Sequence, residues 1–297
     1  MRPDGRSRVT AGEGRRTLAA MGRHRPSVRP SLSLMHQLRG RSYFICPSRK
    51  VIFSAIPKSG VESLRYLILR EEREPNPHRI WEPRFDKYII TIRRSFPADH
   101  AYLVIVRNPY HRLVSGYLDK FLTGNFHLLP FCETAMHFYR RSMHDGRRVN
   151  FEEFVTFLVA QPPHLVDPHF QPQTSLFRMC SRARIYKLEE RGIHDALREL
   201  GFTHEFLNYR SHHLYSLRHE HVPNAHQQYY GEFDIAERRM TPVDPPHAAG
   251  IGFEGAVVPA YGDFYTEALR KLVYEYYADD FHVLGYAEHS LKPGERP

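Results

Sequence analysis

The chain has 297 residues and a formal net charge of +9, and this charge is concentrated near the N-terminus. Residues 1–41 contain ten arginines and two acidic residues, whereas the rest of the chain is almost neutral, which argues against a nucleic-acid-binding protein that is basic throughout. The three cysteines lack metal-ligand spacing and cannot all pair, and no run of about 18 apolar residues predicts a membrane span.

The arginine-rich segment 1–41 has three interpretations. It is a disordered tail, an organelle-targeting segment, or an over-long start with initiation at Met21 or Met35. We expect residues 42–297 to form the folded domain, because a chain with 41% hydrophobic residues can bury a large core.

The first predicted elements are a strand, a tight loop and a helix. Lys50–Ile56 (KVIFSAI) predicts a strand, and Val61–Glu72 has apolar residues at helical spacing. N–H groups at a helix start bind anions, Gly60 lets the backbone approach closely, and Lys58 adds a mobile cation. The unit therefore predicts a phosphate-binding loop without the Walker spacing, because the lysine precedes the glycine.

A second unit of this kind follows about 50 residues later. Ala101–Val106 (AYLVIV) predicts a buried parallel strand, and Asn108-Pro109 suits the N-cap and first position of a helix over Tyr110–Leu122. Ligands of such sheets lie beyond the carboxyl ends of the strands, where both loops are expected.

Two arginines and a serine give the second unit its predicted chemistry. Arg107 ends the strand, and Arg112 and Ser115 are three residues apart, so they share one face of the helix. The planar fork of arginine suits bidentate binding of phosphate oxygens. We therefore expect this unit to hold a second phosphate.

The rest of the chain continues the alternation of strands and helices. Helices are predicted over Phe151–Ala160 and Ile193–Leu200, with a strand over Arg184–Leu188 between them. Tyr209–Ala260 is rich in His, Pro and Gly and predicts a long loop or insert, and Asp263–Tyr277 predicts a final amphipathic helix. The order predicts an α/β fold with a mostly parallel sheet.

Four parts of the chain resemble sulfotransferases that use 3′-phosphoadenosine-5′-phosphosulfate (PAPS). The 5′-phosphosulfate loop of these enzymes is similar to residues 57–64 (PKSGVESL), and the 3′-phosphate motif of their carbohydrate branch is similar to residues 104–121 (VIVRNPYHRLVSGYLDKF). The middle segment of that branch is similar to residues 167–173 (DPHFQPQ) with 184–190 (RIYKLEE), and its C-terminal helix to residues 265–286. The resemblance implies a P-loop-NTPase-like three-layer fold and transfer of a sulfuryl group to a hydroxyl.

The same resemblance implies roles for individual residues. Lys58 would stabilise charge on the bridging oxygen as the phosphate leaves, Arg107 and Ser115 would hold the 3′-phosphate, and Arg112 would assist. Further contacts of the first loop with PAPS would come from Pro57, Ser59, Gly60, Val61 and Ser63. The resemblance also implies that no metal is needed. Sulfuryl transfer, like phosphoryl transfer, depends mainly on positioning and charge stabilisation, which suits this set of residues.

The first loop departs from the family pattern at Glu62, where relatives usually have Thr or Ser. An ionised carboxylate would repel the phosphosulfate, and two like unit charges 4 Å apart cost about 4 kcal/mol at an effective dielectric constant of about 20. Three arrangements would avoid this cost: Glu62 pairs with an arginine, turns away from the loop, or is protonated. If none holds, the chain is a non-catalytic or altered sulfotransferase-like binding protein.

His169 is the predicted general base, because it lies in the family-like segment 167–173 and histidine is tuned easily to neutral pH. Asp167 would orient it, while the alternative is a packing or capping role in a proline-rich loop. Weaker candidates for the base are His78, Glu82, His111 and Glu62. A further group interpreted as solvated rather than metal-binding comprises His212, His213, His219, His221 and His226.

The sequence thus predicts an enzyme that moves the sulfuryl group of PAPS to a hydroxyl of a carbohydrate, either a glycan or a glycolipid. A nucleotide-dependent small-molecule kinase is a weaker alternative, because neither GxxxxGK[ST] nor a magnesium-binding aspartate after a strand is found. The acceptor site is expected in the loops around 72–100, 122–150 and 209–260, and a cytoplasmic location is the simplest expectation.

Overall fold

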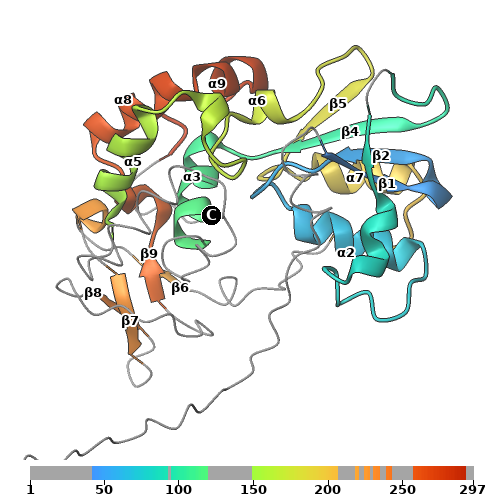
Figure 1. Ribbon diagram of the computed structural model, residues 1–297, viewed down its shortest axis with the longest axis horizontal. Coiled ribbons are helices and arrows are strands. Elements are labelled where there is room, and N and C mark those ends of the chain that lie inside the picture. Colours follow the sequence, from blue (N-terminus) through green and yellow to red (C-terminus); the bar gives the residue numbers. More distant parts are fainter. Residues whose placement is uncertain are drawn as a thin grey trace, which may run out of the picture.

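The computed structural model of the chain (Figure 1) describes residues 42–92, 95–119, 149–206, 218–220, 224–227, 230–234, 239–242 and 257–291. The predictions for residues 1–41 and for the acceptor loop around 122–150 lie largely or wholly outside these ranges. No helix of the described residues is long and apolar enough to cross a membrane.

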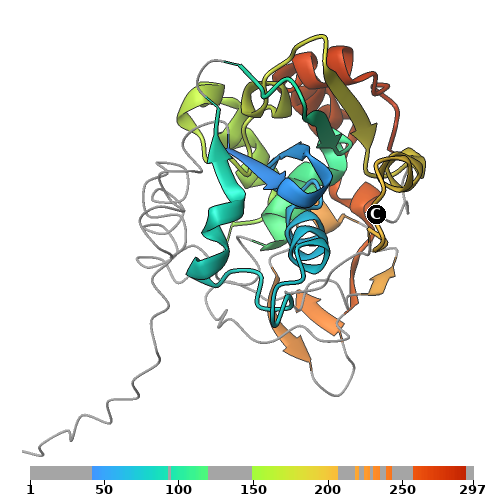
Figure 2. The ribbon, with the colours of Figure 1, turned by 90° about the vertical axis from the view of Figure 1, so that its right-hand side faces the viewer.

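A five-stranded sheet forms the centre of one half of the molecule (Figures 1 and 2). Its strands, in spatial order, are β3 (Ile89–Thr91), β1 (Ser42–Cys46), β2 (Val51–Ser54), β4 (Ala101–Val106) and β5 (Ala183–Lys187). The pairs β2–β4 and β4–β5 are parallel, whereas β1 is antiparallel to both β2 and β3. The predicted parallel arrangement is therefore confirmed for the centre of the sheet, and among its described strands β1 alone is reversed.

Helices make up most of the other regular secondary structure in the described chain. The α-helices are α2 (Val61–Glu71), α3 (Pro109–Tyr117), α5 (Phe151–Val159), α6 (Gln173–Leu176), α7 (Gly192–Glu199), α8 (Glu267–Tyr276) and α9 (Ala278–Leu284). Short 3-10 turns are η1 (Pro47–Arg49), η2 (Pro83–Tyr88), η5 (Pro163–Leu165), η7 (Ala225–Gln227) and η8 (Tyr261–Phe264).

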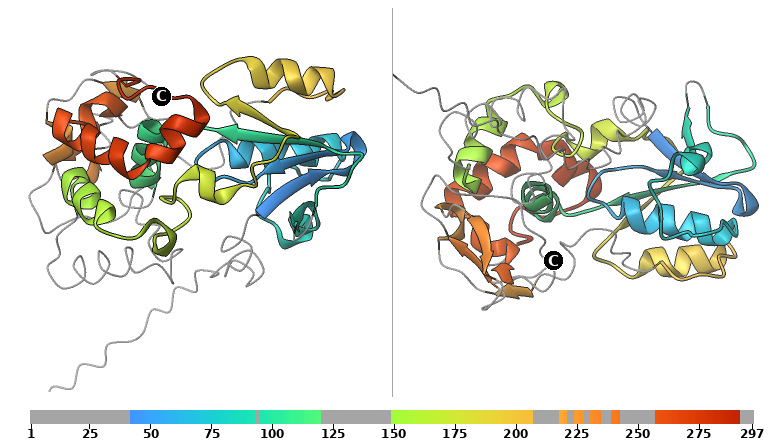
Figure 3. Two further views of the ribbon diagram at one scale, coloured as in Figure 1. Left: turned by 90° about the horizontal axis from the view of Figure 1, so that it is seen from above. Right: turned by 60° about the horizontal axis from the view of Figure 1, so that its bottom comes forward.

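The sheet carries apolar residues on both faces. One face packs against α2 and α7, which lie alongside each other in Figure 3, and buries residues such as Phe53 of β2 and Leu103 of β4. The other face buries Tyr102 and Val104 against Phe177, which follows α6, and Leu284 of α9. Alternating side chains of β4 thus serve both faces, as a central strand buried on both sides requires.

A second hydrophobic core lies among α3, α5, α8 and α9, beside the sheet (Figure 3). Phe151 and Phe154 of α5 contact Tyr117 of α3, and Phe281 of α9 contacts Tyr110 of α3. Helix α3 thus belongs to this core, although only two residues separate it from β4 of the sheet. This connection fixes the second predicted loop between the two cores.

Side-chain caps explain where two helices begin. The Asn108 side chain accepts a hydrogen bond from Tyr110 N, with Pro109 at the first helical position, which confirms the predicted start of α3. At α5, Asn150 and Glu153 form a reciprocal capping box. Both caps involve residues that are close in sequence, so the amino-acid sequence alone contains the patterns that predict them.

The C-terminal region differs from its predicted single helix over Asp263–Tyr277. Asp263 lies instead in η8, and α8 begins only after Thr266, whose hydroxyl accepts a hydrogen bond from Leu269 N. A separate helix, α9, then follows Tyr277. The predicted bounds were wrong because the cap at Thr266 outweighs the apolar spacing that continues before it.

Where the structure describes the predicted long loop over residues 209–260, it shows four short strands, which the sequence did not indicate. They are β6 (Arg218–Glu220), β7 (Tyr230–Asp234), β8 (Arg239–Pro242) and β9 (Val257–Pro259), and they form a second sheet in the order β6-β9-β8-β7. β6 pairs with β9, far along the chain. Strands of this length that pair at a distance leave no periodic signal in the sequence.

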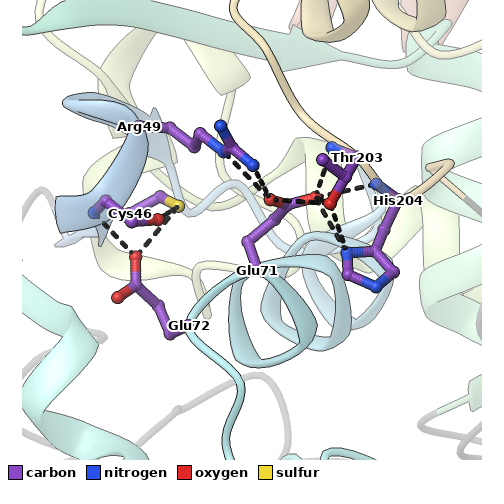
Figure 4. A network of polar contacts seen from close by, with 7 residues as sticks. Cys46, Arg49, Glu71, Glu72, Thr203 and His204 are labelled. Atoms are coloured by element: carbon purple, nitrogen blue, oxygen red, sulfur yellow. Dashed lines mark hydrogen bonds and ion pairs between the residues drawn. The ribbon is translucent and has the colours of Figure 1, made fainter.

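A buried carboxylate fixes the end of α2 that is remote from the first loop (Figure 4). The Glu71 side chain is 1% exposed and accepts hydrogen bonds from Arg49 Nε at 2.9 Å and Nη2 at 2.8 Å. It also accepts from Thr203 N at 2.7 Å and His204 N at 2.8 Å. Burial alone would raise the pKa of Glu71, but these hydrogen bonds outweigh burial and lower the pKa to about 2.

This network predicts an acid-sensitive contribution to stability. The pKa of Glu71 is lower in the folded chain than in the unfolded one, so its contribution of about 3 kcal/mol is present above pH 4.5 and is lost as the pH falls toward 2. We expect Glu71→Gln to lower the free energy of unfolding by about this amount at pH 7 and by less below pH 4. Urea unfolding measures both values, with the exposed Glu199→Gln as control; an equal loss at both pH values would contradict the assignment.

Candidate active site

The two predicted anion-binding loops leave the same edge of the sheet. β2 and β4 are parallel neighbours, with Phe53 opposite Leu103. Residues 55–60 follow β2 and lead into α2, and residues 107–108 follow β4 and lead into α3. Two strand–loop–helix units are therefore side by side at the carboxyl ends of adjacent strands, which is where parallel sheets bind ligands.

The first loop turns through two left-handed residues, Lys58 with φ 68° and Gly60 with φ 80°. A Cβ atom on Gly60 would lie 3.0 Å from Phe206 and 3.3 Å from Leu188, so conformation and crowding both favour glycine here. The first α2 hydrogen bond runs from Leu64 N to Gly60 O. The N–H groups of the first turn lie outside the helical ladder, which is the arrangement that binds anions.

Both arginines of the second unit hold carbonyl oxygens of the first loop. Arg107 Nη1 donates to Lys58 O at 3.3 Å, and Arg112 Nε donates to Pro57 O at 2.9 Å. These contacts engage the negative ends of two loop peptide groups. The guanidinium groups of Arg107 and Arg112 thus join the two loops directly. The sequence motif predicts phosphate binding for both arginines and gives no sign of these contacts.

Arg112 is a buried clamp. Besides Pro57, it donates from Nη1 to Gln171 O at 2.7 Å and from Nη2 to Pro168 O at 2.8 Å, and the residue is 2% exposed. Burial lowers the pKa of its guanidinium. The geometry gives Arg112 a positioning role through three backbone carbonyls, while its predicted contact with a phosphate is untested.

Gln173, at the start of α6, joins the two loops a second time. Its side-chain oxygen accepts from Ser59 Oγ at 3.0 Å and from Arg107 N at 2.9 Å, and its amide nitrogen donates to Arg107 O at 2.7 Å. Gln173 is fully buried. No sequence pattern predicted this role, although Gln173 is the last residue of the family-like segment 167–173.

The hydroxyl and the backbone N–H of Ser59 both make hydrogen bonds within the protein. It is 1% exposed, its hydroxyl donates to Gln173, and its N–H donates to Ile56 O at 3.1 Å. The structure therefore gives Ser59 a part in shaping the loop, while its predicted contact with PAPS is untested. Val61, Glu62 and Ser63 form the first turn of α2, where the Glu62 departure lies half-buried.

Asp280 of α9 holds the backbone of Gln173 in place. Its carboxylate is fully buried and accepts from Gln173 N at 2.7 Å and Thr174 N at 2.9 Å, so it caps the N-terminus of α6. Thr174 Oγ1 donates to the same carboxylate at 2.9 Å. The C-terminal helix thereby reaches the loops through one aspartate and one glutamine.

The second loop keeps Arg107 and Ser115 at its surface. Both are half-buried, and the Arg107 guanidinium lies 5.6 Å from the centre of the Tyr261 ring. The loop backbone is held by Glu189, which accepts from Asn108 N at 2.8 Å. Lys58 of the first loop also reaches this unit, because its Nζ lies 2.5 Å from Oδ2 of Asp119, just after α3.

The predicted base, His169, is oriented by Asp167 as expected. Asp167 Oδ1 lies 2.6 Å from His169 Nδ1 and accepts from His169 N at 2.8 Å. A proton on Nδ1 leaves Nε2 as the basic atom. Arg112 donates hydrogen bonds both to the backbone oxygen of the neighbouring Pro168 and to that of Pro57. A single guanidinium therefore connects the segment that contains His169, residues 167–173, with the first loop.

The weaker candidates for the base are placed less favourably. His78 is exposed, Glu82 is paired with Arg84 at 2.7 Å, and His111 is buried against Tyr261. Of the histidine group interpreted as solvated, His212, His213 and His221 lie outside the described residues, and His226 is buried. Within the described part of the chain, no three His, Cys, Asp or Glu side chains are grouped to hold a metal ion.

The bridging role of Gln173 predicts a cost on its removal. Gln173→Ala leaves the Ser59 hydroxyl and both backbone groups of Arg107 without this partner, so we expect a loss of about 2–4 kcal/mol in the free energy of unfolding. Gln171→Ala is the matched control, because its amide nitrogen makes one hydrogen bond, to Val166 O. Equal losses in urea unfolding of the two variants would contradict the bridging role.

Comparison with known proteins identifies the family to which these loops belong. The Sulfotransferase family matches the chain over residues 41–287, which include both loops, Gln173 and Asp280. Searches of curated proteins and of solved structures each returned no match. The matched range covers most of the sequence and every site residue described above, and the chain therefore belongs to the sulfotransferase family.

Proposed function

We propose that this sulfotransferase moves the sulfuryl group of PAPS to a hydroxyl of a carbohydrate acceptor, in a P-loop-like three-layer fold. The observation that carries the proposal is the pairing of two strand–loop–helix units at adjacent parallel strands, joined by Arg107, Arg112 and Gln173. A donor with a phosphosulfate at one end and a 3′-phosphate at the other needs two such anion sites at a fixed separation.

The first loop is proposed to hold the phosphosulfate. The N–H groups of the first α2 turn, from Val61 to Ser63, would meet its oxygens, with the positive end of the helix dipole behind them. Lys58 would offset the negative charge that develops on the bridging oxygen. Pro57, Ser59 and Gly60 fix the path of the loop, through Arg112, Gln173 and a left-handed turn respectively.

The second loop is proposed to hold the 3′-phosphate. Arg107 and Ser115 are its half-buried polar residues, and Asn108 and Glu189 keep its backbone in place. Arg112 takes part only through the carbonyls that it binds. A guanidinium fork and a hydroxyl together suit a phosphate with several acceptor oxygens.

His169 is proposed as the general base. It would take the proton of the acceptor hydroxyl on Nε2 while the new oxygen–sulfur bond forms and the bond from sulfur to the bridging oxygen breaks. Asp167 would stabilise the imidazolium that results, through its contact with Nδ1. The carbohydrate acceptor is supported by the form of the 104–121 motif alone.

Glu62 favours a second candidate, a non-catalytic or altered binding protein of the same family. Its carboxylate occupies the second position of α2, in the turn that would meet the phosphosulfate. Acidic residues are favourable near a helix N-terminus, which accounts for Glu62 without any ligand. Donor binding therefore decides between the two candidates.

Calorimetry with adenosine 3′,5′-bisphosphate tests the proposed donor site. We expect the full chain to bind this nucleotide and Arg107→Ala to bind it about 10- to 100-fold more weakly, because a charged hydrogen bond is lost. Arg198→Ala, an exposed arginine on α7, is the matched control. Binding of ATP with magnesium instead would support the kinase alternative, and binding of neither would support the non-catalytic one.

The base is tested by separating turnover from binding. His169→Ala should reduce sulfate transfer from labelled PAPS by about 10²- to 10⁴-fold and leave binding of the bisphosphate unchanged. His164→Ala, an exposed histidine in the same proline-rich segment, serves as control. The assay requires a panel of glycans, glycolipids and small hydroxyl compounds, and turnover by His169→Ala at the original rate would refute the assignment.

A further inference from the structure

The proposed catalytic lysine already has a charged partner in this structure. Lys58 Nζ lies 2.5 Å from Asp119 Oδ2, and the two side chains are 13% and 6% exposed. Asp119 lies in the 104–121 motif, just beyond the end of α3. No sequence pattern predicted a contact of Asp119 with Lys58, because the two residues are 61 positions apart.

Helix α3 and the residues directly after it contact two successive residues of the first loop, Pro57 and Lys58. Arg112 and Ser115 share one side of α3, and Asp119 follows four residues after Ser115, two positions beyond the end of the helix. Arg112 binds the backbone oxygen of Pro57, and Asp119 binds the side chain of Lys58. Ser115, the proposed 3′-phosphate ligand, lies between these two contacts along the helix.

The contact constrains what Lys58 can do. Its backbone is held in a left-handed conformation, with its carbonyl bound by Arg107, so the ammonium moves mainly by turning its side chain. The Coulomb attraction within an ion pair is stronger where water is largely excluded than at the surface. Full engagement of Lys58 with an anion on the first loop therefore requires loosening its contact with Asp119.

We propose that Asp119 is a positioning residue that restrains Lys58 beside α3, so that the lysine contributes less to donor binding than its charge would allow. This inference rests on the proposed function, in which Lys58 meets the phosphosulfate. Asp119 acts through Lys58 and touches no reacting atom. The restraint would limit the strength of the contact between Lys58 and the donor at the start of the reaction.

A double-mutant cycle on nucleotide binding tests the restraint. The ligand is adenosine 3′,5′-bisphosphate, and calorimetry is carried out on the full chain, Lys58→Met, Asp119→Asn and the double variant. We expect Asp119→Asn to bind about 10-fold more tightly than the original chain. We also expect Lys58→Met to cost about 10-fold more affinity when Asp119 is replaced than when it is present.

The second expectation separates restraint from simple repulsion. A fixed carboxylate that only repels the ligand changes affinity by the same factor whether or not Lys58 is present. Coupling arises only if ligand binding changes the contact between Lys58 and Asp119. Equal costs of Lys58→Met in the two backgrounds, or weaker binding by Asp119→Asn, would overturn the inference.

Two controls keep the result interpretable. Adenosine 3′-monophosphate lacks the 5′-phosphate, so all four proteins should bind it equally if the second loop is intact. Asp119→Glu keeps the carboxylate and should behave like the original chain, and Asp119→Ser replaces Asp119→Asn if that variant does not fold. Failure of the original chain to bind the bisphosphate would refute the proposed function itself, whereas binding without coupling would refute this inference alone.

Discussion

The guanidinium of Arg112 is the contact on which the rest of the site depends. A buried charge is costly unless it is hydrogen-bonded, and here three backbone carbonyls, of Pro57, Pro168 and Gln171, surround it. These carbonyls belong to the first loop and to the histidine segment, while Arg112 itself belongs to α3. One side chain therefore fixes three separate pieces of chain, and any movement of α3 would leave a buried charge without its partners.

The polar contacts around Arg112 connect segments that are far apart in the sequence. Gln173 from the middle segment binds both loops, and Asp280 from the C-terminal segment binds Gln173. Each of these atoms must be of one chemical kind to satisfy a buried partner, whereas the apolar residues between them need only suitable volume. The segments that resemble the family are thus those that meet at the loops.

Local signals in the sequence predicted the strands and helices that lead into the site. The strand Ala101–Val106 and the cap at Asn108 depend on neighbouring residues only, and both are confirmed. Gln173, Asp119 and the second sheet depend on partners distant in sequence, so no periodic pattern announced them. For Arg112 the motif gives residue type and spacing, whereas its burial and its contacts with three backbone carbonyls appear only in the fold.

The distribution of positive charge at the loops limits what charge alone can contribute to donor binding. The sequence places three cations there, but the structure engages Arg112 with backbone and Lys58 with Asp119, and shares Arg107 between Lys58 O and the Tyr261 ring. Such a site attracts an anion less than three unpaired cations would. For the proposed donor with two anionic ends, selectivity would then come from the orientation of N–H groups at α2 and of Arg107 at the second loop. Arg112 and Gln173 hold both loops in place through buried hydrogen bonds, so these contacts would shape the site that the donor meets.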